Sequence, residues 1–368
     1  MATGEAMILQ PAEKASFPSE CAVEAGLPDI WRAVLEQNGA RFDGAGVVDF
    51  GQAESERRKA LGGDVMADLS HHGLIEVRGD DAQKFLASLF TGDVRLVSPG
   101  RGLFTSWCDA KGRARATFWL FVHEGAFYLL LPKDLVKTVL AGLKQYLLRV
   151  KATLADAGDN PMRLGLSGPG MASRLSAVFG ASPPGQAGEA GRYGDCTLMA
   201  IGGDPFPRWL AIGSAAAIAD LWQNLVSTVS PAGRDAWSLL DILAGMPLLV
   251  SEIAGEFIPQ MLNMEALGGL CFTKGCYPGQ EVIARLHYRG QLKRRLYLAY
   301  AESDSVPAPG TTLHIDGVAE SVGTVVSAAR HPDGRVALLA VVKIEEKDQG
   351  EVRLADVQGP ALRIVESS

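Results

Sequence analysis

The feature that most constrains the fold of this chain is an internal repeat of a strand, a glycine and a helix. Residues 74–79 are typical of a strand that ends at a glycine, and residues 164–168 repeat that pattern. When Gly79 is aligned with Gly168, the apolar positions of the two following helices coincide: Leu86 with Leu175, and Phe90 with Phe179. Such self-similarity indicates two copies of one supersecondary unit.

Each copy continues as strand, turn, strand and helix. The expected segments are 116–123, 126–131 and 133–148 in the first copy, and 197–202, 209–212 and 214–226 in the second. Units of this kind cover one face of an antiparallel sheet with helices. We therefore predict an α+β fold with two related α/β modules that contain antiparallel sheets.

The pattern changes after Pro307. Short alternating runs follow one another between turn residues, with no long helix: 311–315, 323–328, 336–342, 351–354 and 361–365. This pattern is typical of a small β-barrel or a Greek-key domain. The predicted division is an N-terminal extension and first module in residues 1–155, a second module in 156–292 and a C-terminal barrel in 293–368. Within the extension, residues 1–26 are expected to be loosely ordered.

Residues 274–281, Lys-Gly-Cys-Tyr-Pro-Gly-Gln-Glu, combine a cation, a thiol, an aromatic ring and an amide in a short segment. Gly275 and Gly279 permit tight turns or a close approach to a ligand. Lys274 lies two residues from Cys276, and a nearby cation favours thiolate over thiol. A tight turn with a buried, inert cysteine is the alternative. The full combination of residues favours a functional site.

Charge is distributed unevenly. The chain has a net charge of −7, which argues against sequence-independent nucleic-acid binding. A basic cluster nevertheless occurs within eleven residues: Arg285, Arg289, Lys293, Arg294 and Arg295. It is either a solvated face or a local attractor for an anionic ligand beside the motif.

The five cysteines do not form a disulfide framework, because they are odd in number and scattered. Cys271 and Cys276 have a C-x4-C spacing, which is a weak metal signal without a second pair, and we predict no metal site. A reducing compartment fits this usage. The N-terminus lacks a basic region with a long apolar core, and no run of apolar residues is long enough for a membrane span. We expect a cytoplasmic protein.

Residues 274–281 resemble the signature of the YgfZ-type folate-binding proteins, a branch of the glycine-cleavage T-protein (aminomethyltransferase) superfamily. Four other segments carry the same resemblance: residues 257–260, Asn263, residues 266–269 and residues 108–112. The similarity runs from about Asp68 to the C-terminus. It implies a T-protein-like ring with a central channel, tetrahydrofolate or a derivative as cofactor, and a role in maintaining iron–sulfur enzymes.

A folate pocket needs aromatic walls, hydrogen-bonding groups for the pterin edge, and cations for the glutamate tail. By the resemblance, Trp237 matches a position that stacks near folate, and His72 replaces a second tryptophan of the family. Gln260, Asn263 and Gln280 offer donors and acceptors, and Arg285 offers a bidentate cation. The predicted cofactor-binding residues are Trp237, His72, Gln260, Asn263, Tyr277, Gln280 and Arg285.

Two departures from the superfamily bear on activity. Leu243 stands where many members carry a pterin-reading glutamate, and residues 113–117 lack the aspartate that assists aminomethyl transfer. Classical aminomethyltransferase activity is therefore not expected. The predicted catalytic residues are Cys276, Lys274 and Asp109.

Three functional hypotheses follow. The first is a folate-binding accessory protein that supports iron–sulfur cluster assembly or repair in client enzymes through a reactive Cys276 at the folate channel. The second is a folate-dependent one-carbon transferase that takes its acid from Asp109. The third is a folate-free scaffold, suggested by Leu243 and His72. The expected partners are folate and iron–sulfur client or assembly proteins, without membrane or nucleic acid.

Overall fold

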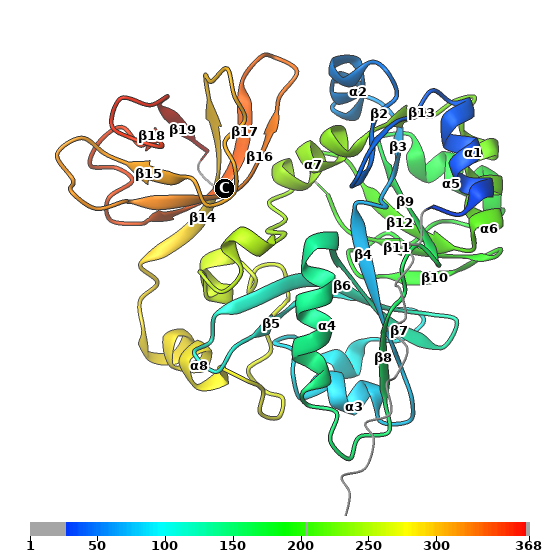
Figure 1. Ribbon diagram of the computed structural model, residues 1–368, viewed down its shortest axis with the longest axis horizontal. Helices are drawn as coiled ribbons and strands as arrows, with labels where there is room; N and C mark the ends of the chain where they lie inside the picture. The colour runs from blue at the N-terminus through cyan, green and yellow to red at the C-terminus, as the bar shows by residue number, and fades with distance from the viewer. Residues whose placement is uncertain (1–26, 204, 366–368) are drawn as a thin grey trace, which may run out of the picture.

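The computed structural model describes residues 27–203 and 205–365, so the prediction for residues 1–26 lies outside the described part. Figure 1 shows two sheets that carry helices, beside a separate β-structure at the C-terminal end. Within the described residues the protein has both helices and largely antiparallel sheets. The predicted α+β class is confirmed.

The first module is built on a five-stranded sheet in the order β5-β6-β7-β4-β8. Its strands are β4 (His72–Arg78), β5 (Leu103–Cys108), β6 (Ala114–His123), β7 (Ala126–Pro132) and β8 (Thr153–Asp156). Its helices are α3 (Ala82–Ala87), η1 (Val94–Leu96), η2 (Lys133–Leu135) and α4 (Val136–Lys144). The long helix predicted over residues 133–148 is therefore a 3-10 turn followed by a shorter α-helix.

The second module repeats this order with one addition. Its elements are β9 (Met162–Ser167), α5 (Met171–Phe179), β10 (Ala190–Tyr193), β11 (Cys196–Ala200), β12 (Arg208–Gly213), α6 (Ala215–Leu225) and β13 (Ser230–Ala232). The sheet runs β10-β11-β12-β9-β3-β13, so β3 (Val65–Asp68) is inserted between β9 and β13. A strand from before the first module thus completes the second sheet, while the division at residue 155 stays a prediction.

The two glycines that defined the repeat have the same structural role. Gly79 and Gly168 adopt φ values of +119° and +141°, where a side chain is strained. A Cβ atom on either would also lie 2.3 Å from a neighbouring atom, Lys151 O or Asp64 Oδ1 respectively. Each strand therefore needs a glycine to pass into the following helix.

Both faces of the second sheet are buried. Because successive residues of a strand point to opposite faces, each strand contributes to two cores. Leu198, Ala200 and Trp209 face a core formed with α5, α6 and α1 (Asp29–Gln37). The alternate positions Met199 and Leu210 belong to the core shared with the first sheet. The sheets are therefore held together by apolar packing between modules.

The remaining N-terminal elements cover the second sheet and the helix that follows it. They are β1 (Arg41–Asp43), β2 (Gly46–Asp49) and α2 (Ala53–Ala60). Pro28 precedes α1, and Trp31 of this helix packs against Trp222 of α6 with ring centroids 5.4 Å apart. Helix α7 (Arg234–Leu243) then connects the second module to the C-terminal part and contacts β16 and β17.

The C-terminal sheet is a nearly closed barrel in the order β18-β15-β16-β17-β14-β19. Its strands are β14 (Arg294–Ala301), β15 (Thr312–His314), β16 (Gly323–Arg330), β17 (Val336–Lys343), β18 (Arg353–Leu354) and β19 (Leu362–Ile364). A bridge between Arg353 and Ala361 joins the ends of the sheet. Strand β14 precedes the runs that the sequence pattern marked. It was not predicted as a strand because its first residues, Arg294 and Arg295, belong to the basic cluster.

Candidate functional site

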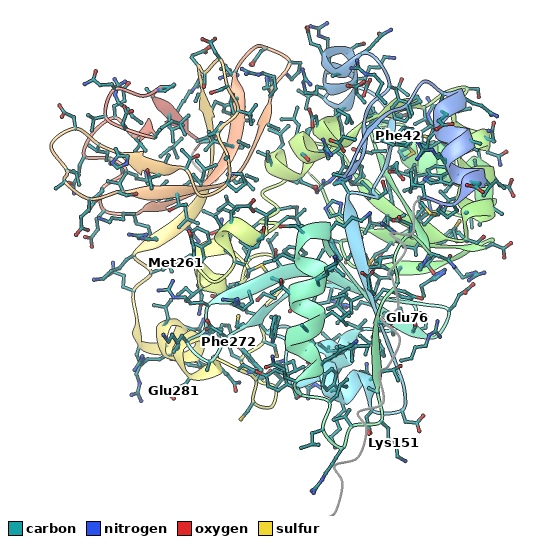
Figure 2. All side chains as sticks on the ribbon, viewed as in Figure 1. Phe42, Glu76, Lys151, Met261, Phe272 and Glu281 are labelled. Atoms are coloured by element: carbon teal, nitrogen blue, oxygen red, sulfur yellow. The ribbon has the colours of Figure 1, made fainter. Side chains whose placement is uncertain are left out.

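The motif loop, residues 274–279, precedes helix α8 (Gln280–Arg289) and lies against the β5–β6 turn. Gly279 has a φ of +78°, and a Cβ atom there would lie 2.4 Å from Gly112 Cα and 2.6 Å from Asp109 O. This contact brings together the two segments, residues 108–112 and 274–281, that carried the family resemblance. In Figure 2, Phe272 and Glu281 mark the two ends of this region near α8.

Lys274 is directed toward helix α3 rather than into solvent. Its Nζ donates to Ala87 O at 2.8 Å and to Phe90 O, and it lies 4.6 Å from the ring centroid of Tyr277. Burial lowers the pKa of Lys274 to about 8, opposed by the nearby Cys271 and Asp93. The cation therefore satisfies carbonyls at the C-terminal end of α3, as helix ends require.

The described cysteines differ in exposure. Cys276 is exposed, Cys271 is partly exposed, and Cys108 and Cys196 are buried. Burial raises the pKa of Cys108 to about 12 and that of Cys196 to about 11. Cys276 therefore has the access to solvent that a reactive thiol needs, while the cysteine that interacts electrostatically with Lys274 is Cys271.

The predicted polar residues near the motif make contacts that hold the loop and its neighbours. Gln260, in η4 (Pro259–Leu262), donates to Ile283 O at 2.7 Å. Asn263 donates to Leu296 O and accepts from Arg295 Nε. Asp109 accepts from the backbone N–H groups of Lys111 and Arg113, which closes the β5–β6 turn. These three side chains are engaged within the protein.

The other four predicted binding residues, Tyr277, Gln280, Arg285 and Trp237, differ in how deeply they are buried. Tyr277 is buried with its hydroxyl unpaired, and burial raises the pKa of that hydroxyl. Gln280 opens α8, and Arg285 is exposed on it. Trp237 is 2% exposed, and its ring packs on Gly165 and under Arg208. None of these four lines the cavity described next.

A cavity of ≈340 Å³ lies between the first module, α7 and the barrel. Its polar lining comes from four segments that are far apart in the sequence: His71 and His72, Lys133 and Asp134, Arg234, Ser238 and Asp241, and Ser327. Met246, Leu248 and Val326 supply apolar walls. Of the ten residues predicted as functional, His72 is the one that lines it.

The adjacent imidazoles of His71 and His72 form the most distinctive wall of this cavity. Their ring centroids lie 4.3 Å apart. Both nitrogens of His71 and Nδ1 of His72 are buried without a hydrogen-bond partner. Burial lowers the pKa of His72 to about 3 and that of His71 well below its usual value, so both rings are neutral near pH 7. Unpaired buried polar atoms are costly, and here they favour a bound polar ligand.

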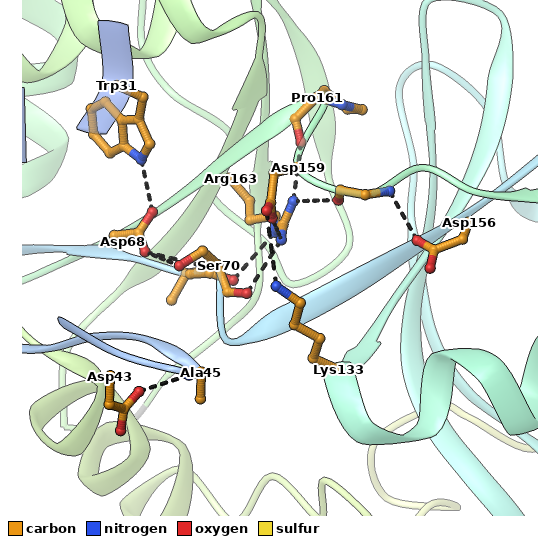
Figure 3. Close-up of polar contacts among 12 residues, drawn as sticks. Trp31, Asp43, Ala45, Asp68, Ser70, Lys133, Asp156, Asp159, Pro161 and Arg163 are labelled. Atoms are coloured by element: carbon orange, nitrogen blue, oxygen red, sulfur yellow. Dashed lines mark hydrogen bonds and ion pairs between the residues drawn. The ribbon is translucent and has the colours of Figure 1, made fainter. Parts of the chain in front are cut away.

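Figure 3 shows the polar network that fixes the turn leading to these histidines. Trp31 Nε1 donates to Asp68 Oδ1 at 2.8 Å, and Asp68 accepts from Ser70. Arg163, fully buried, pairs with Asp159 at 2.6 Å and donates to the carbonyls of Leu69 and Ser70. Its positive charge also contributes to the low pKa of both histidines.

A second buried ion pair supports the opposite wall. Arg208 Nη1 lies 2.6 Å from Asp241 Oδ1, with side-chain exposures of 1% and 13%. Burial raises the pKa of Asp241, and Arg208 opposes that shift. Arg234, about two helical turns earlier on α7, pairs with Asp43 at 2.8 Å. The cavity thus presents neutral imidazoles, the carboxylates of Asp134 and Asp241, and cations within one enclosure.

Sequence reasoning missed His71, Arg234, Ser238 and Asp241. Arg234, Ser238 and Asp241 recur at spacings of four and three residues, which places them on one face of a helix. That periodicity beside Trp237 was a usable signal, as was the His71-His72 dipeptide. Among the described residues, no group of three or more histidine, cysteine or acidic side chains could hold a metal ion.

Comparison with known proteins gives a consistent result. Residues 47–204 match the model of the GCVT N-terminal domain. The chain is 32% identical over 294 residues to the "tRNA-modifying protein YgfZ" of Pectobacterium carotovorum subsp. carotovorum (strain PC1), covering 79% of this chain and 87% of that protein. It is also 32% identical over 301 residues to the protein of that name from Sodalis glossinidius (strain morsitans), covering 81% and 91%.

Among solved structures, the glycine cleavage system aminomethyltransferase T from Bartonella henselae matches with a TM-score of 0.69. The match covers 92% of this chain and 96% of that one at 18% sequence identity, so it establishes a shared fold. Among the described residues, no helix has the length and apolar character that a membrane crossing needs.

Proposed function

The chain belongs to the YgfZ family of proteins with the T-protein fold, and from this premise we propose that it is a folate-binding accessory protein for iron–sulfur enzymes. The observation that supports this proposal is the ≈340 Å³ cavity lined by His71 and His72. Ligand pockets of about 300–1,000 Å³ with apolar walls and a few convergent polar groups are typical of small-molecule sites.

The residues of the cavity fit a tetrahydrofolate. Neutral His71 and His72 supply flat walls and unpaired nitrogens for a heterocycle. Asp241 and Ser238 supply groups for the pterin edge. Arg234 and Lys133 supply cations for a carboxylate tail. Bound folate would carry a one-carbon unit, and these side chains would hold it and exclude water.

Cys276 would act outside this cavity, on the surface of the motif loop. Its exposed thiol could reach a client protein and transiently ligate iron or exchange sulfur ligands. Relatives of this chain are named tRNA-modifying proteins, so we propose that one client is an iron–sulfur enzyme that modifies tRNA. The net charge of −7 favours contact with such a protein over direct contact with RNA.

One observation keeps the transferase hypothesis as a second candidate. Asp241 is a carboxyl group in the cavity wall whose pKa burial raises, as suits a general acid. Asp109, the acid that the sequence suggested, is instead held by two backbone N–H groups. Turnover of methylene-tetrahydrofolate with an amine acceptor, retained in Asp109→Asn and lost in Asp241→Asn, would favour this function.

Calorimetric titration with tetrahydrofolate under anaerobic conditions tests the binding proposal. Ser238→Trp fills the cavity from α7, and we expect it to weaken binding at least about tenfold. Asn224→Trp, exposed on α6, is the matched control and should leave affinity unchanged. Equal affinity in Ser238→Trp and wild type would place folate elsewhere. If the wild type does not bind tetrahydrofolate, only the hypothesis of a folate-free scaffold remains.

Complementation of a strain that lacks its own family member tests the thiol. Cys276→Ser should lose rescue of an iron–sulfur enzyme while folate binding stays intact. Cys271→Ser, five residues away in the same segment, is the matched control and should rescue fully. Full rescue by Cys276→Ser would remove the thiol from the function.

A further inference from the structure

An open groove of ≈570 Å³ lies between helix α4 and the strands β5 and β6, separate from the His71–His72 cavity. The two sites share no lining residue. Figure 1 shows α4 crossing in front of β6, beside β5. The side chains that give the α4 groove its chemistry are Trp107, Arg115, Lys137, Thr138, Gln145 and Tyr146.

Every polar side chain in this lining can donate a hydrogen bond, and none is acidic. Among the described residues, no carboxylate forms an ion pair with Arg115 or Lys137, although most arginines elsewhere pair with aspartate or glutamate. Trp107 Nε1 is buried and has no acceptor. A groove with two cations, several donors and no carboxylate has the chemistry of an anion site.

The backbone is shaped to leave these groups available. Gly142 lies on the face of α4 toward the groove, and a Cβ atom there would come within 2.2 Å of the Trp107 ring. The missing side chain lets the helix lie against the indole while Tyr146, one turn later, stays 46% exposed. Gly255 lies under Arg115, where a Cβ atom would be 2.9 Å from Nη1. Two glycines thus position one aromatic ring and one cation.

The position of Arg115 sharpens the assignment. It is half-buried on β6, and no carboxylate among the lining residues neutralises its charge. The remainder of the chain is acidic overall, so this local positive charge is not a consequence of composition.

We propose that the α4 groove binds a small molecule that carries an oxyanion, either a carboxylate or a phosphate ester, next to a flat ring. Arg115 and Lys137 bind the oxyanion, Trp107 Nε1–H donates a further hydrogen bond, and the ring packs against Trp107 and Tyr146. Guanidinium and ammonium groups bind carboxylate and phosphate by the same charge-assisted hydrogen bonds, so the groove accepts both sources.

The test follows the indole N–H signal of Trp107 in ¹⁵N-labelled full-length protein, with Trp107→Phe identifying it among the six tryptophans. The probes are inorganic phosphate, adenosine monophosphate and p-aminobenzoylglutamate. We expect saturable shifts with at least one ring-bearing probe, weakened about tenfold or more by Arg115→Gln and by Lys137→Gln. Lys144→Gln, exposed on the same helix outside the groove, is the matched control and should change nothing.

The three probes distinguish a phosphate ester from a carboxylate ligand, and the variant Ser238→Trp separates this site from the proposed folate cavity. Tighter binding of the monophosphate assigns a phosphate ester, and tighter binding of the benzoylglutamate assigns a carboxylate. Ser238→Trp should leave either affinity unchanged, because it lines the other site. The proposal is overturned if no probe shifts the Trp107 signal, if Lys144→Gln weakens binding as much as Arg115→Gln, or if Ser238→Trp abolishes the shift.

Discussion

The motif loop and the His71–His72 cavity contrast in how their residues are engaged. Lys274, Asp109 and Gln260 donate to or accept from backbone groups, and they hold the loop in place. In the cavity, three imidazole nitrogens have no partner within the protein. Around the motif most of these polar groups are paired, apart from the Tyr277 hydroxyl and Gln260 Oε1, while the cavity with little sequence signal has polar groups left for a ligand.

This contrast shows that a specific motif can reflect a requirement of folding as well as a requirement of chemistry. Gly279 is required because the loop touches Gly112 closely, whether or not Cys276 reacts. Cys276 and Tyr277 are the exceptions in the motif, since the thiol is exposed and the buried hydroxyl has no partner. Substitutions at the two places should therefore differ in whether they change stability, ligand binding or client activity.

The largest effect is expected on the cavity side, from Asp241→Ala. The substitution leaves Arg208, 1% exposed, as a buried charge without its carboxylate, which costs about 3–5 kcal/mol of unfolding free energy. Asp235→Ala, exposed on the same helix, is the control and should change stability by less than about 0.5 kcal/mol. Urea unfolding measures both. A loss below 1 kcal/mol for Asp241→Ala would contradict a supporting role for the pair.

On the motif side, the largest effect is expected from Gly279→Ala. It combines a φ of +78° with a backbone contact of 2.4 Å to Gly112, so we expect a loss of about 2–4 kcal/mol. Gly275→Ala is the matched control, because nothing lies within 4 Å of its added Cβ atom. Thermal unfolding of the two variants measures the difference. Similar melting temperatures would show that the loop is free to move away from the β5–β6 turn.

The cavity should also make stability depend on pH in the acidic range, where Lys274 of the motif loop, with a pKa of about 8, stays protonated in both the folded and the unfolded state. The pKa of His72 is about 3 in the folded state against 6.5 for a free histidine, so between these values only the unfolded state binds the proton. Stability should therefore fall as pH is lowered from 6.5, by about 1.4 kcal/mol per pH unit for this group. Urea unfolding between pH 7 and pH 5 measures the slope.

His72→Phe should reduce the slope of stability against pH by about 1.4 kcal/mol per pH unit, which corresponds to one proton. His314→Gln on strand β15 is the control and should leave the slope unchanged. An unchanged slope in His72→Phe would mean that His72 takes up its proton without unfolding, and that the cavity is open to water.

A smaller loss is expected from Lys274→Met in the motif loop. The ammonium donates to Ala87 O and Phe90 O at the end of α3, and methionine keeps much of the apolar stem. We expect a loss of about 1–2 kcal/mol, measured by urea unfolding. Lys84→Met, on the same helix, is the control. If Lys274→Met instead changed only client activity, the cation would serve Cys276 after all.

The smallest effect on stability is expected from Cys276→Ser, within about 0.5 kcal/mol, because the side chain is exposed. Its unfolding midpoint should match that of wild type even where complementation is lost. A marked loss of stability would assign the thiol a structural role, and the contrast between loop and cavity would disappear.

Much of the architecture could be predicted from the sequence because its signals are local. The repeat of strand, glycine and helix follows from Gly79 and Gly168, and alternation gave the barrel strands after Pro307. Strand β3 was missed because its four residues are all buried, so they show no alternation, and its partners β9 and β13 lie more than ninety residues away. The predicted second module therefore lacked one of its strands.

The site was harder to predict for a related reason. The His71–His72 cavity is assembled from the first module, α7 and the barrel, so no single stretch of sequence contains it. His72 was found only because of its place in the family pattern. His71 and Asp241 have the right chemistry but acquire it through burial and through Arg163 and Arg208, which come from other strands.

The inserted strand β3 has a consequence for how this protein is made. During synthesis, Val65–Asp68 leaves the ribosome well before its partner Met162–Ser167, so it must wait, unpaired, until that later segment emerges. The first sheet is built from residues 72–156 alone, but the second sheet cannot be completed without this earlier strand. Cutting the chain between residues 68 and 162 would separate two paired strands. The second sheet is therefore expected to close only after β9 and β13 have been made.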